Sequence, residues 1–413
     1  MDNEQDISSN AVTDHELGFR LTMTDEQTAA RLGRLVTQRG EIQLPAFMPV
    51  GTQASVKSLS PDDVARTGSE ILLANTYHLM LRPGVDLIRE AGGLHRFMAW
   101  PRPILTDSGG FQVYSLAHRR KVTESGVEFR SHLDGSKHHL TPERAIDLQL
   151  GFGSDVIMPL DDVVGFDSDA PIQDVAMERT HRWLNRAIEH FGERVEVDRN
   201  GDRPLLFGIA QGGFDGQRRR ESARRVSEVP VDGCSIGGLS VGEPKALMLE
   251  MLEHSMSELS DDRPRYLMGV GSPEDLWQSV ALGVDMFDCV HPTRVARRGA
   301  LFTFDGRVNV TSARFRRHFD PVDPLCDCET CQTFSAAYLH HLFHAHELLA
   351  YRLATIHNLR FMQRLMSAIR TSIESGTFKI EMQTFLNRYR VADVDRAAEQ
   401  KQKWAIARGL TSS

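Results

Sequence analysis

The sequence predicts an α/β fold organised as a (β/α)8 barrel with insertions. Short runs rich in Ile, Leu and Val stop abruptly at polar or glycine residues, as buried parallel strands do. Helical patterns lie between several of these runs, and alternation of strand and helix is typical of a closed barrel. The predicted strand regions are residues 71–78, 103–112, 155–162, 204–213, 234–240, 266–276 and 284–290.

Two of the intervening helices carry clear start signals. Thr141 and Glu143 open one helical segment, and the sequence Ser-Pro-Glu-Asp at 272–275 opens another. A doubly wound open sheet is the alternative architecture. It is disfavoured because no glycine-rich phosphate loop of the expected form follows a first strand.

Length and composition are those of a globular protein. The 413 residues can bury a sizeable core, and 41% hydrophobic with 25% charged residues is ordinary. The longest apolar runs fall far short of a membrane span. Residues 1–16 are polar and acidic, without the apolar core of a secretory signal. We therefore expect a cytoplasmic protein with a polar N-terminal extension and no membrane association.

Charge is distributed unevenly along the chain. The net charge of −8 argues against a nucleic-acid partner, yet basic clusters occur at 218–225, 294–298 and 314–318. Such clusters are usually solvated helix faces. Only the cluster at 294–298 adjoins residues that carry chemistry.

Three carboxylates follow predicted strands, where they would face the mouth of a barrel. Asp107, Asp161 and Asp288 resemble the carboxylates of enzymes that act at an anomeric carbon. Any single one could instead cap the following helix. Cys289 is a possible nucleophile, although a cysteine in a strand is more often part of the core. Two uncharged residues, Gln211 and Gly238, also follow predicted strands.

A cysteine cluster predicts a metal site. Cys326, Cys328 and Cys331 lie within six residues, and histidines follow at 340, 341, 344, 346 and 357. Three thiolates and one imidazole form a closed tetrahedral zinc site, which is structural because no position is open to water. Spacing leaves the histidine undecided: His340 and His341 are near, whereas His357 requires the chain to fold back.

Taken together, the motifs resemble the bacterial tRNA-guanine transglycosylase family. The segments LTDSGGFQ, GIAQGG, GGLSVGE, RYLMGVGSPEDL, FDCVHPTRVARRG and CDCETC occur in the family's order, and the resemblance spans residues 17 to 400. It implies an enzyme of queuosine biosynthesis, a pentosyltransferase. Such an enzyme exchanges guanine at wobble position 34 of G-U-N anticodons for 7-aminomethyl-7-deazaguanine (preQ1). The exchange proceeds by double displacement through a covalent enzyme–RNA intermediate.

The resemblance also assigns roles to individual residues. Asp288 matches the nucleophile that attacks C1′ of the ribose, and Asp107 matches the general acid/base. Asp161 would accept hydrogen bonds from N1–H and the 2-amino group of the base. The implied substrate-binding set is Asp107, Ser108, Gly109, Gly110, Phe111, Asp161, Gln211, Gly238, Leu239 and Met268.

Within that set, each side chain has a distinct task. Gln211 and the backbone N–H of Gly238 would donate to O6 of the base. Phe111 and Met268 would sandwich the flat ring, although core packing is the ordinary role of either residue type. The Leu239 carbonyl would accept the aminomethyl group of the substrate.

Three further residues bear on the choice of base. Glu243 would support the Leu239 peptide. Val241 is typical of bacterial members, whereas eukaryotic relatives tend to have glycine there for bulkier queuine. Val163 departs from the cysteine that many bacterial members carry near the pocket. The resemblance therefore favours preQ1, with a queuine-salvaging enzyme as the alternative.

Partners and metal ligands also follow from the resemblance. It implies binding of the anticodon loops of Asp, Asn, His and Tyr tRNAs by a homodimer, and selects His357 as the fourth zinc ligand with Cys326, Cys328 and Cys331. Arg294 and Arg297 would grip phosphates or loop bases. The implied RNA-contacting residues are Gly269, Val270, Gly271, Ser272, Pro273, Glu274, Asp275, Thr293, Arg294, Val295, Ala296 and Arg297.

The predicted organisation has four parts, and two rival functions are weighed against it. The N-terminal extension at 1–16 precedes a catalytic barrel at 17–310, a zinc-binding subdomain at 311–362 and closing helices at 363–413. A non-catalytic tRNA-binding subunit would lack the nucleophile or the zinc ligands, and both are present. A zinc hydrolase would require an open coordination position, which a Cys3His shell denies.

Overall fold

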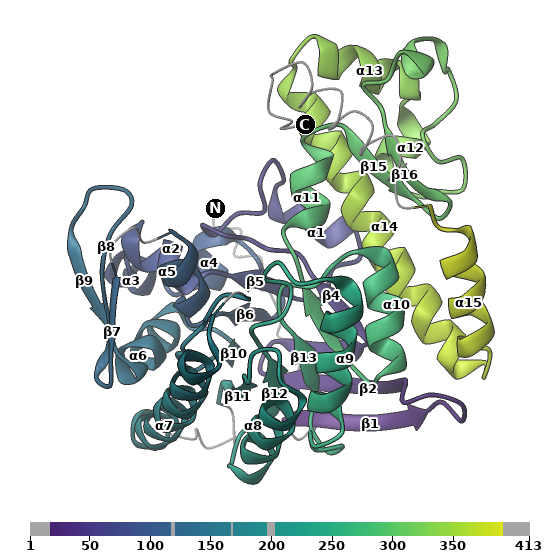
Figure 1. The fold of residues 1–413 in the computed structure, drawn as a ribbon. Coiled ribbons are helices and arrows are strands. Elements are labelled where there is room, and N and C mark those ends of the chain that lie inside the picture. The colour runs from purple at the N-terminus through teal and green to yellow at the C-terminus, as the bar shows by residue number, and fades with distance from the viewer. Residues whose placement is uncertain (1–16, 117–119, 167, 196–202, 391–413) are drawn as a thin grey trace, which may run out of the picture.

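A computed structural model describes residues 17–116, 120–166, 168–195 and 203–390. Eight parallel strands form one sheet in the order β4-β14-β13-β12-β11-β10-β6-β5 (Figure 1). From β5 to β14, each of these strands pairs with the one that follows it along the chain, and β14 pairs back with β4. This topology confirms the predicted (β/α)8 barrel. The strands are β4 (Ala46–Met48), β5 (Leu72–Ala74), β6 (Ile104–Thr106), β10 (Val156–Ile157), β11 (Leu205–Ala210), β12 (Gly233–Ile236), β13 (Arg265–Leu267) and β14 (Met286–Asp288).

The barrel closes where the first two strands meet. A parallel bridge joins Val50 to Leu73, just beyond β4. Gly51 N donates to the Leu73 carbonyl at 2.7 Å, and Leu73 N donates to the Pro49 carbonyl at 3.0 Å. Since both edges of the sheet are joined, the open-sheet alternative is wrong.

Helices surround the strands, and the two predicted helix starts are confirmed. Thr141 caps α6 (Pro142–Phe152) by accepting the Arg144 N–H at 3.1 Å, and Gly153 ends it in a left-handed conformation. The helix α10 (Pro273–Ala281) begins directly after Ser272. The other helices of the wall include α1 (Pro61–Arg66), α7 (Ala170–Arg194), α8 (Gly216–Glu228) and α9 (Lys245–Met256).

The last helix of the wall comes from far along the chain. After β14 and the short α11 (His291–Ala296), the chain builds a separate subdomain before α14 (Leu348–Glu374) returns to the barrel. Gln363 donates to the carbonyl of Phe47 at 3.1 Å, and Arg370 donates to that of Pro45 at 2.7 Å. The helix α14 runs without a break through residue 362, so subdomain and barrel share it.

The subdomain stands beside the barrel and has its own apolar cluster (Figure 1). Packing of α15 (Phe378–Arg388) against Trp277 of α10 then completes the C-terminal part of the described chain. The predicted extension at 1–16 and the residues 391–413 of the predicted closing helices lie outside the described residues. The subdomain comprises β15 (Ala300–Thr303), β16 (Gly306–Asn309), η1 (Ala313–Arg317), α12 (Glu329–Thr333) and α13 (Ala336–His344).

Two three-stranded antiparallel sheets were not anticipated from the sequence. The first comprises β1 (Gly18–Thr24), β2 (Arg31–Thr37) and β3 (Gly40–Leu44), whose apolar residues pack into the end of the barrel where the strands begin. It is tied there by Arg31, which donates to both carboxylate oxygens of the buried Asp285 at 3.0 and 2.6 Å. The second is inserted between β6 and α6 and comprises β7 (Arg120–Thr123), β8 (Gly126–Arg130) and β9 (Lys137–Leu140).

Among the described residues, no helix is both long and apolar enough to cross a membrane.

Candidate active site and metal centre

The predicted site residues gather at one end of the barrel. Asp107 directly follows β6, Gln211 follows β11, Met268 follows β13 and Asp288 ends β14. Asp161 lies four residues beyond β10. Because the carboxyl ends of parallel strands share one rim, these side chains line a common mouth, as in other barrel enzymes.

Asp107 is a buried carboxylate fixed by three donors. Its Oδ1 accepts the Thr76 N–H at 2.9 Å, and its Oδ2 accepts the side-chain amides of Asn75 and Gln112. Burial, helped by the charge of Asp288 and opposed by these donors, raises the pKa of Asp107 to about 6. A carboxyl group with this pKa can give and take a proton near neutral pH.

Asp288 is held by one of its oxygens only. The Tyr266 hydroxyl donates to Oδ1 at 2.6 Å, and the Gly269 N–H donates to the same atom at 2.7 Å. Burial raises the pKa of Tyr266 well above its ordinary value, so its hydroxyl stays protonated and remains a donor. Since both bonds go to Oδ1, Oδ2 is the atom available for attack on a substrate carbon.

Asp161 follows β10, which lies across the barrel from β14 and its Asp288. Gln211 Nε2 donates to one carboxylate oxygen at 2.7 Å, and Ser108 Oγ lies 3.4 Å from the other. Burial raises the pKa of Asp161 to about 6, and the neighbouring charge of Asp162 adds to the increase. The carboxylate is therefore costly to keep ionised until a substrate supplies further donors.

Glycines allow the loops of the mouth to pack closely. A Cβ atom on Gly110 would lie 2.7 Å from the Asp161 carboxylate, and Gly109 has a φ of 85° against the backbone of Tyr77. Gly238 has a φ of 68°, and a Cβ there would lie 2.3 Å from the Gln211 side chain. Only glycine fits these positions without displacing the carboxylate or the amide.

Beneath the glycine loops lies a buried cation that the sequence did not single out. Arg219, fully buried on α8, donates to the carbonyls of Gly213 and Gly237 at 2.7 Å each and to that of Gly238 at 3.2 Å. Burial lowers its pKa to about 9. The basic cluster at 218–225 concealed this residue, because three of its other arginines, Arg218, Arg224 and Arg225, pair with acidic residues as a solvated helix face does.

The loop after β12 is held by Glu243. Its carboxylate accepts the backbone N–H groups of Ser240 and Val241, the latter at 2.8 Å. Because a trans peptide is planar, the Leu239 carbonyl points away from the Glu243 carboxylate. The carbonyl is thus fixed in one orientation, as the resemblance implied.

Three other predicted side chains differ in their surroundings. Phe111, on α5 (Gly110–Leu116), is 47% exposed, so its interpretation as a core aromatic is wrong, whereas Met268 is half-buried. Cys289 is also half-buried. Burial and the adjacent Asp288 raise the pKa of Cys289 to about 12, so its thiol stays protonated and is a poor nucleophile.

The predicted RNA-contacting segments expose only part of their side chains. Gly269 and Arg294 are exposed, and Arg297 is half-buried while it donates to the Thr293 carbonyl at 2.7 Å. Ser272, Glu274 and Val295 are half-buried. The remaining residues of the two segments are buried, so they can contact RNA through their backbone groups alone. They are Val270, Gly271, Pro273, Asp275, Thr293 and Ala296.

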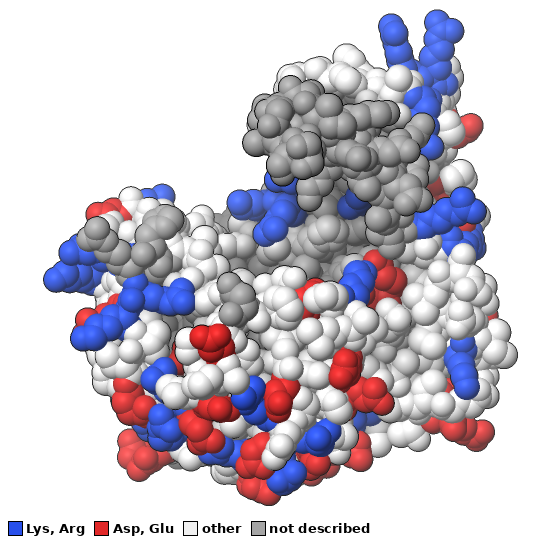
Figure 2. Space-filling model, viewed as in Figure 1, with Lys and Arg blue, Asp and Glu red and all other residues white. Residues whose placement is uncertain are grey.

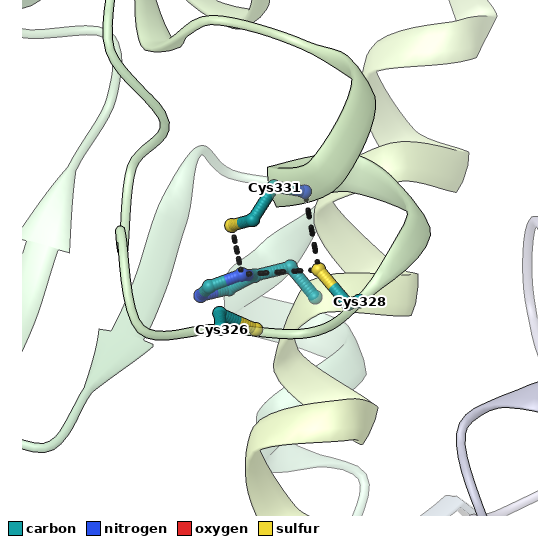
Figure 3. A group of neighbouring side chains, drawn as sticks. Cys326, Cys328 and Cys331 are labelled. Carbon is teal, nitrogen blue, oxygen red and sulfur yellow. Dashed lines mark hydrogen bonds between the residues drawn. The ribbon is translucent and has the colours of Figure 1, made fainter.

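The cysteine cluster forms a group able to hold a metal ion (Figure 3). The segment leading into α12 supplies Cys326 and Cys328, α12 itself supplies Cys331, and α14 supplies His357. All four are buried, with their ligand atoms within 4.8 Å of one another. His340, which spacing also allowed, bonds instead to the carbonyl of Val310 at 2.9 Å.

Hydrogen bonding also fixes the histidine for this role. His357 Nε2 donates to the Phe302 carbonyl at 2.7 Å, so Nδ1 is the nitrogen with a free lone pair. That Nδ1 lies 3.2 Å from Cys331 Sγ and 3.6 Å from Cys328 Sγ. A buried Cys3His donor set of this kind suits a soft or borderline divalent ion.

Together, these observations describe a closed (β/α)8 barrel with Asp107, Asp161 and Asp288 at its mouth. The family model described as "Queuine tRNA-ribosyltransferase" matches residues 25–391. The chain belongs to this family, which confirms the resemblance seen in its motifs.

Relatives at about half identity cover nearly the whole chain. A protein from Herpetosiphon aurantiacus is 52% identical over 385 residues, covering 92% of this chain and 96% of the relative. One from Symbiobacterium thermophilum is 52% identical over 378 residues, with 92% and 93% covered. One from Dictyoglomus turgidum is 48% identical over 387 residues, with 94% and 98% covered. All three are named queuine tRNA-ribosyltransferase.

Neutralising the buried Asp161 should stabilise the protein at neutral pH. Its pKa rises from 3.8 to about 6 on folding, so the folded state binds more protons and stability falls as pH rises through this window. The cost at pH 8 is up to about 3 kcal/mol. Asp161→Asn should therefore melt higher than wild type at pH 8, and the difference should vanish near pH 3.5. Thermal scans at both pH values measure this, and equal gains at both would contradict it.

Proposed function

We propose that the protein exchanges guanine at wobble position 34 of G-U-N tRNAs for 7-aminomethyl-7-deazaguanine. The observation that carries this proposal is a pair of carboxylates at the mouth, of which Asp107 is buried and Asp288 is half-buried. Asp288 is fixed through Oδ1 alone, and Asp107 has a pKa of about 6 beside it. One group suits nucleophilic attack and the other suits proton transfer, which is the division that a double displacement requires.

The reaction divides into two displacements at C1′ of the ribose. Oδ2 of Asp288 attacks C1′, the bond from C1′ to N9 breaks, and the leaving guanine takes a proton from Asp107. Asp107 then takes the N9 proton of the entering base, whose N9 attacks C1′ and releases Asp288. Two inversions restore the original configuration, and the phosphodiester chain stays intact throughout.

Recognition of the base uses the groups opposite Asp288. The Asp161 carboxylate accepts N1–H and the 2-amino group together, which compensates for its burial. Gln211 and the Gly238 N–H donate to O6. Phe111, already exposed at the rim, stacks on one face of the base while Met268 covers the other. The substrate set remains Asp107, Ser108, Gly109, Gly110, Phe111, Asp161, Gln211, Gly238, Leu239 and Met268.

The substituent at position 7 is selected by the loop after β12. Since Glu243 holds the N–H groups of Ser240 and Val241, the fixed Leu239 carbonyl can accept a hydrogen bond from an ammonium group. A nitrile has no proton to donate to it. The Val241 side chain occupies space that a cyclopentene ring would require.

The RNA reaches this pocket by flipping one base out of the anticodon loop, which is cheap because loop bases are only partly stacked. Arg294 and Arg297 contact the neighbouring phosphates, with backbone groups of 269–275 and 293–297 beside them. The tRNAs for Asp, Asn, His and Tyr are the proposed partners. The proposal also includes a cytoplasmic homodimer in which one active site serves each tRNA; ultracentrifugation with tRNA tests that ratio.

The proposed metal is one structural Zn2+ ion per subunit, held by Cys326, Cys328, Cys331 and His357. Four protein ligands fill a tetrahedral shell, so the ion supplies folding free energy and takes no part in the reaction.

Removing one zinc ligand should lower stability and zinc content together. Cys328→Ala leaves three ligands, so the variant should hold less than one zinc per chain and melt well below wild type. Elemental analysis and thermal scans measure the two quantities. Cys234→Ala, a buried cysteine outside the cluster, is the control and should keep its zinc. A Cys328→Ala protein that kept its zinc but lost the chemical step would contradict the structural role.

Replacing the nucleophile should abolish exchange without unfolding the protein. Asp288→Asn keeps the shape but offers a poor nucleophile, so incorporation of labelled guanine into tRNA should fall at least about 1000-fold. Affinity for tRNA should stay within a few-fold of wild type. Denaturing gels report the covalent intermediate, and an RNA adduct trapped on the Asn variant would refute the assignment.

Base choice should follow Val241. Wild type should incorporate 7-aminomethyl-7-deazaguanine well and queuine poorly, and Val241→Gly should raise use of queuine by about 10-fold by removing the steric conflict. Competition of each base against labelled guanine measures this. If queuine displaced guanine as efficiently as the aminomethyl base in wild type, the chain would be a salvage enzyme, and Val163 would be the next residue to vary.

A further inference from the structure

The insertion β7–β9 sits at the rim of the active site. His132, in the turn between β8 and β9, shares a hydrogen bond of 2.8 Å between its Nδ1 and the Tyr77 hydroxyl, and the two rings stack. Tyr77 follows Asn75 and Thr76, which hold Asp107. The tip of the insertion is therefore two contacts away from the catalytic carboxylate.

The outward face of this sheet carries unneutralised positive charge. The Phe129 ring packs against Tyr77, and Val127 on the same side of the strand is also buried. The residues that alternate with them, Glu128 and Arg130, therefore point outward. Arg130 lies directly opposite Lys137 on that face, and both are exposed. Like charges placed directly opposite each other destabilise a sheet, so this pair is unfavourable for the fold alone.

Two of the three carboxylates of the insertion have local donors, and the third, Glu128, lies on the outward face beside the cations. Glu124 pairs with Arg182 through two bonds of 2.8 Å, and Asp134 is bonded within its own turn by Ser136. Glu128 lies opposite Lys121. In the described part of the chain, neither Arg130 nor Lys137 forms an ion pair, and Arg130 donates only to the carbonyl of Gly135, at 2.9 Å. Figure 2 shows Lys and Arg side chains over this insertion, whereas the lower face mixes both signs.

The charged face is shaped and braced before any partner arrives. A shallow groove of about 530 Å3 runs over it, with Arg130, Lys137 and His139 in its lining. From α7, Trp183 Nε1 donates to the Glu124 carbonyl at 2.9 Å, and Arg186 donates to the same carbonyl at 2.7 Å. A surface held in this way loses little conformational entropy when it binds a ligand.

We propose that this outward face of β7–β9 binds the sugar–phosphate backbone of the tRNA stem that continues from the loop in the active site. The proposal rests on the proposed function and extends it to the part of the RNA outside the pocket. Two adjacent cations with long side chains match consecutive phosphates, and the rim position places them where the RNA leaves the mouth. Within a chain of net charge −8, such a local excess steers a polyanion to one side.

The test compares charge removal at this pair with removal of a distant charge. The variants are Arg130→Ala, Lys137→Ala and their combination, and the control is Lys379→Ala, an exposed residue on α15. Each single change should raise the KM for tRNA roughly fivefold, and the double change about 25-fold. The slope of log affinity against log salt should fall by about 1.5 in the double variant. The kcat and the KM for the base should not change.

Two readouts separate this proposal from its premise and from simple misfolding. Wild-type exchange of labelled guanine reports the proposed function, whereas the tRNA KM of the variants reports the role of the insertion. Arg130→Lys keeps the charge and should restore most of the affinity, and Arg130→Ala should melt no lower than wild type because a repulsion is removed. If the double variant matched Lys379→Ala in its KM for tRNA and in its salt slope, the proposal would be overturned. The charged face would then serve a different partner, such as an acidic protein.

Discussion

The site depends on the free-energy cost of keeping carboxylates out of water. Asp107, Asp161 and Asp288 are all held at the mouth of the barrel in surroundings that raise their pKa values. Burial is the largest cause for each, and only a few hydrogen bonds oppose it. In the proposed function, the same desolvation suits one carboxyl to proton transfer, another to accepting hydrogen bonds from a base, and the third to nucleophilic attack. Keeping these carboxylates ionised at the mouth therefore lowers the stability of the folded protein.

That cost is tolerable because rigid backbone groups hold the mouth in shape. Arg219 ties together the loops after β11 and β12, and Glu243 fixes the peptide groups that follow. Neither residue faces the site as a reacting group. Both lock carbonyls and N–H groups into orientations that a flexible loop would visit only part of the time, so binding free energy is not consumed in ordering them.

The sequence predicted the barrel better than it predicted the parts around it, and the residues proposed for the site lie together at one end of that barrel. Long alternation of strand and helix marks seven barrel strands, but β4 has three residues between Pro45 and Pro49, too few for a pattern. Tyr266 was missed because a tyrosine in an apolar strand has the pattern of core, and its role appears only when β13 and β14 pair. His357 could not be chosen from spacing, since the return of α14 is a tertiary event; the resemblance supplied it.

The helix α14 connects the metal-binding cluster in the subdomain to the barrel. His357 lies in the cluster, and Gln363, six residues later on α14, bonds to Phe47 of β4. Six residues span about 9 Å of helix, so both contacts are made by one stiff rod. Strand β4 pairs with β14, where Met48 lies opposite Asp288. An ion bound at the cluster would therefore also help to fix the alignment of β4 and β14, far from its own ligands.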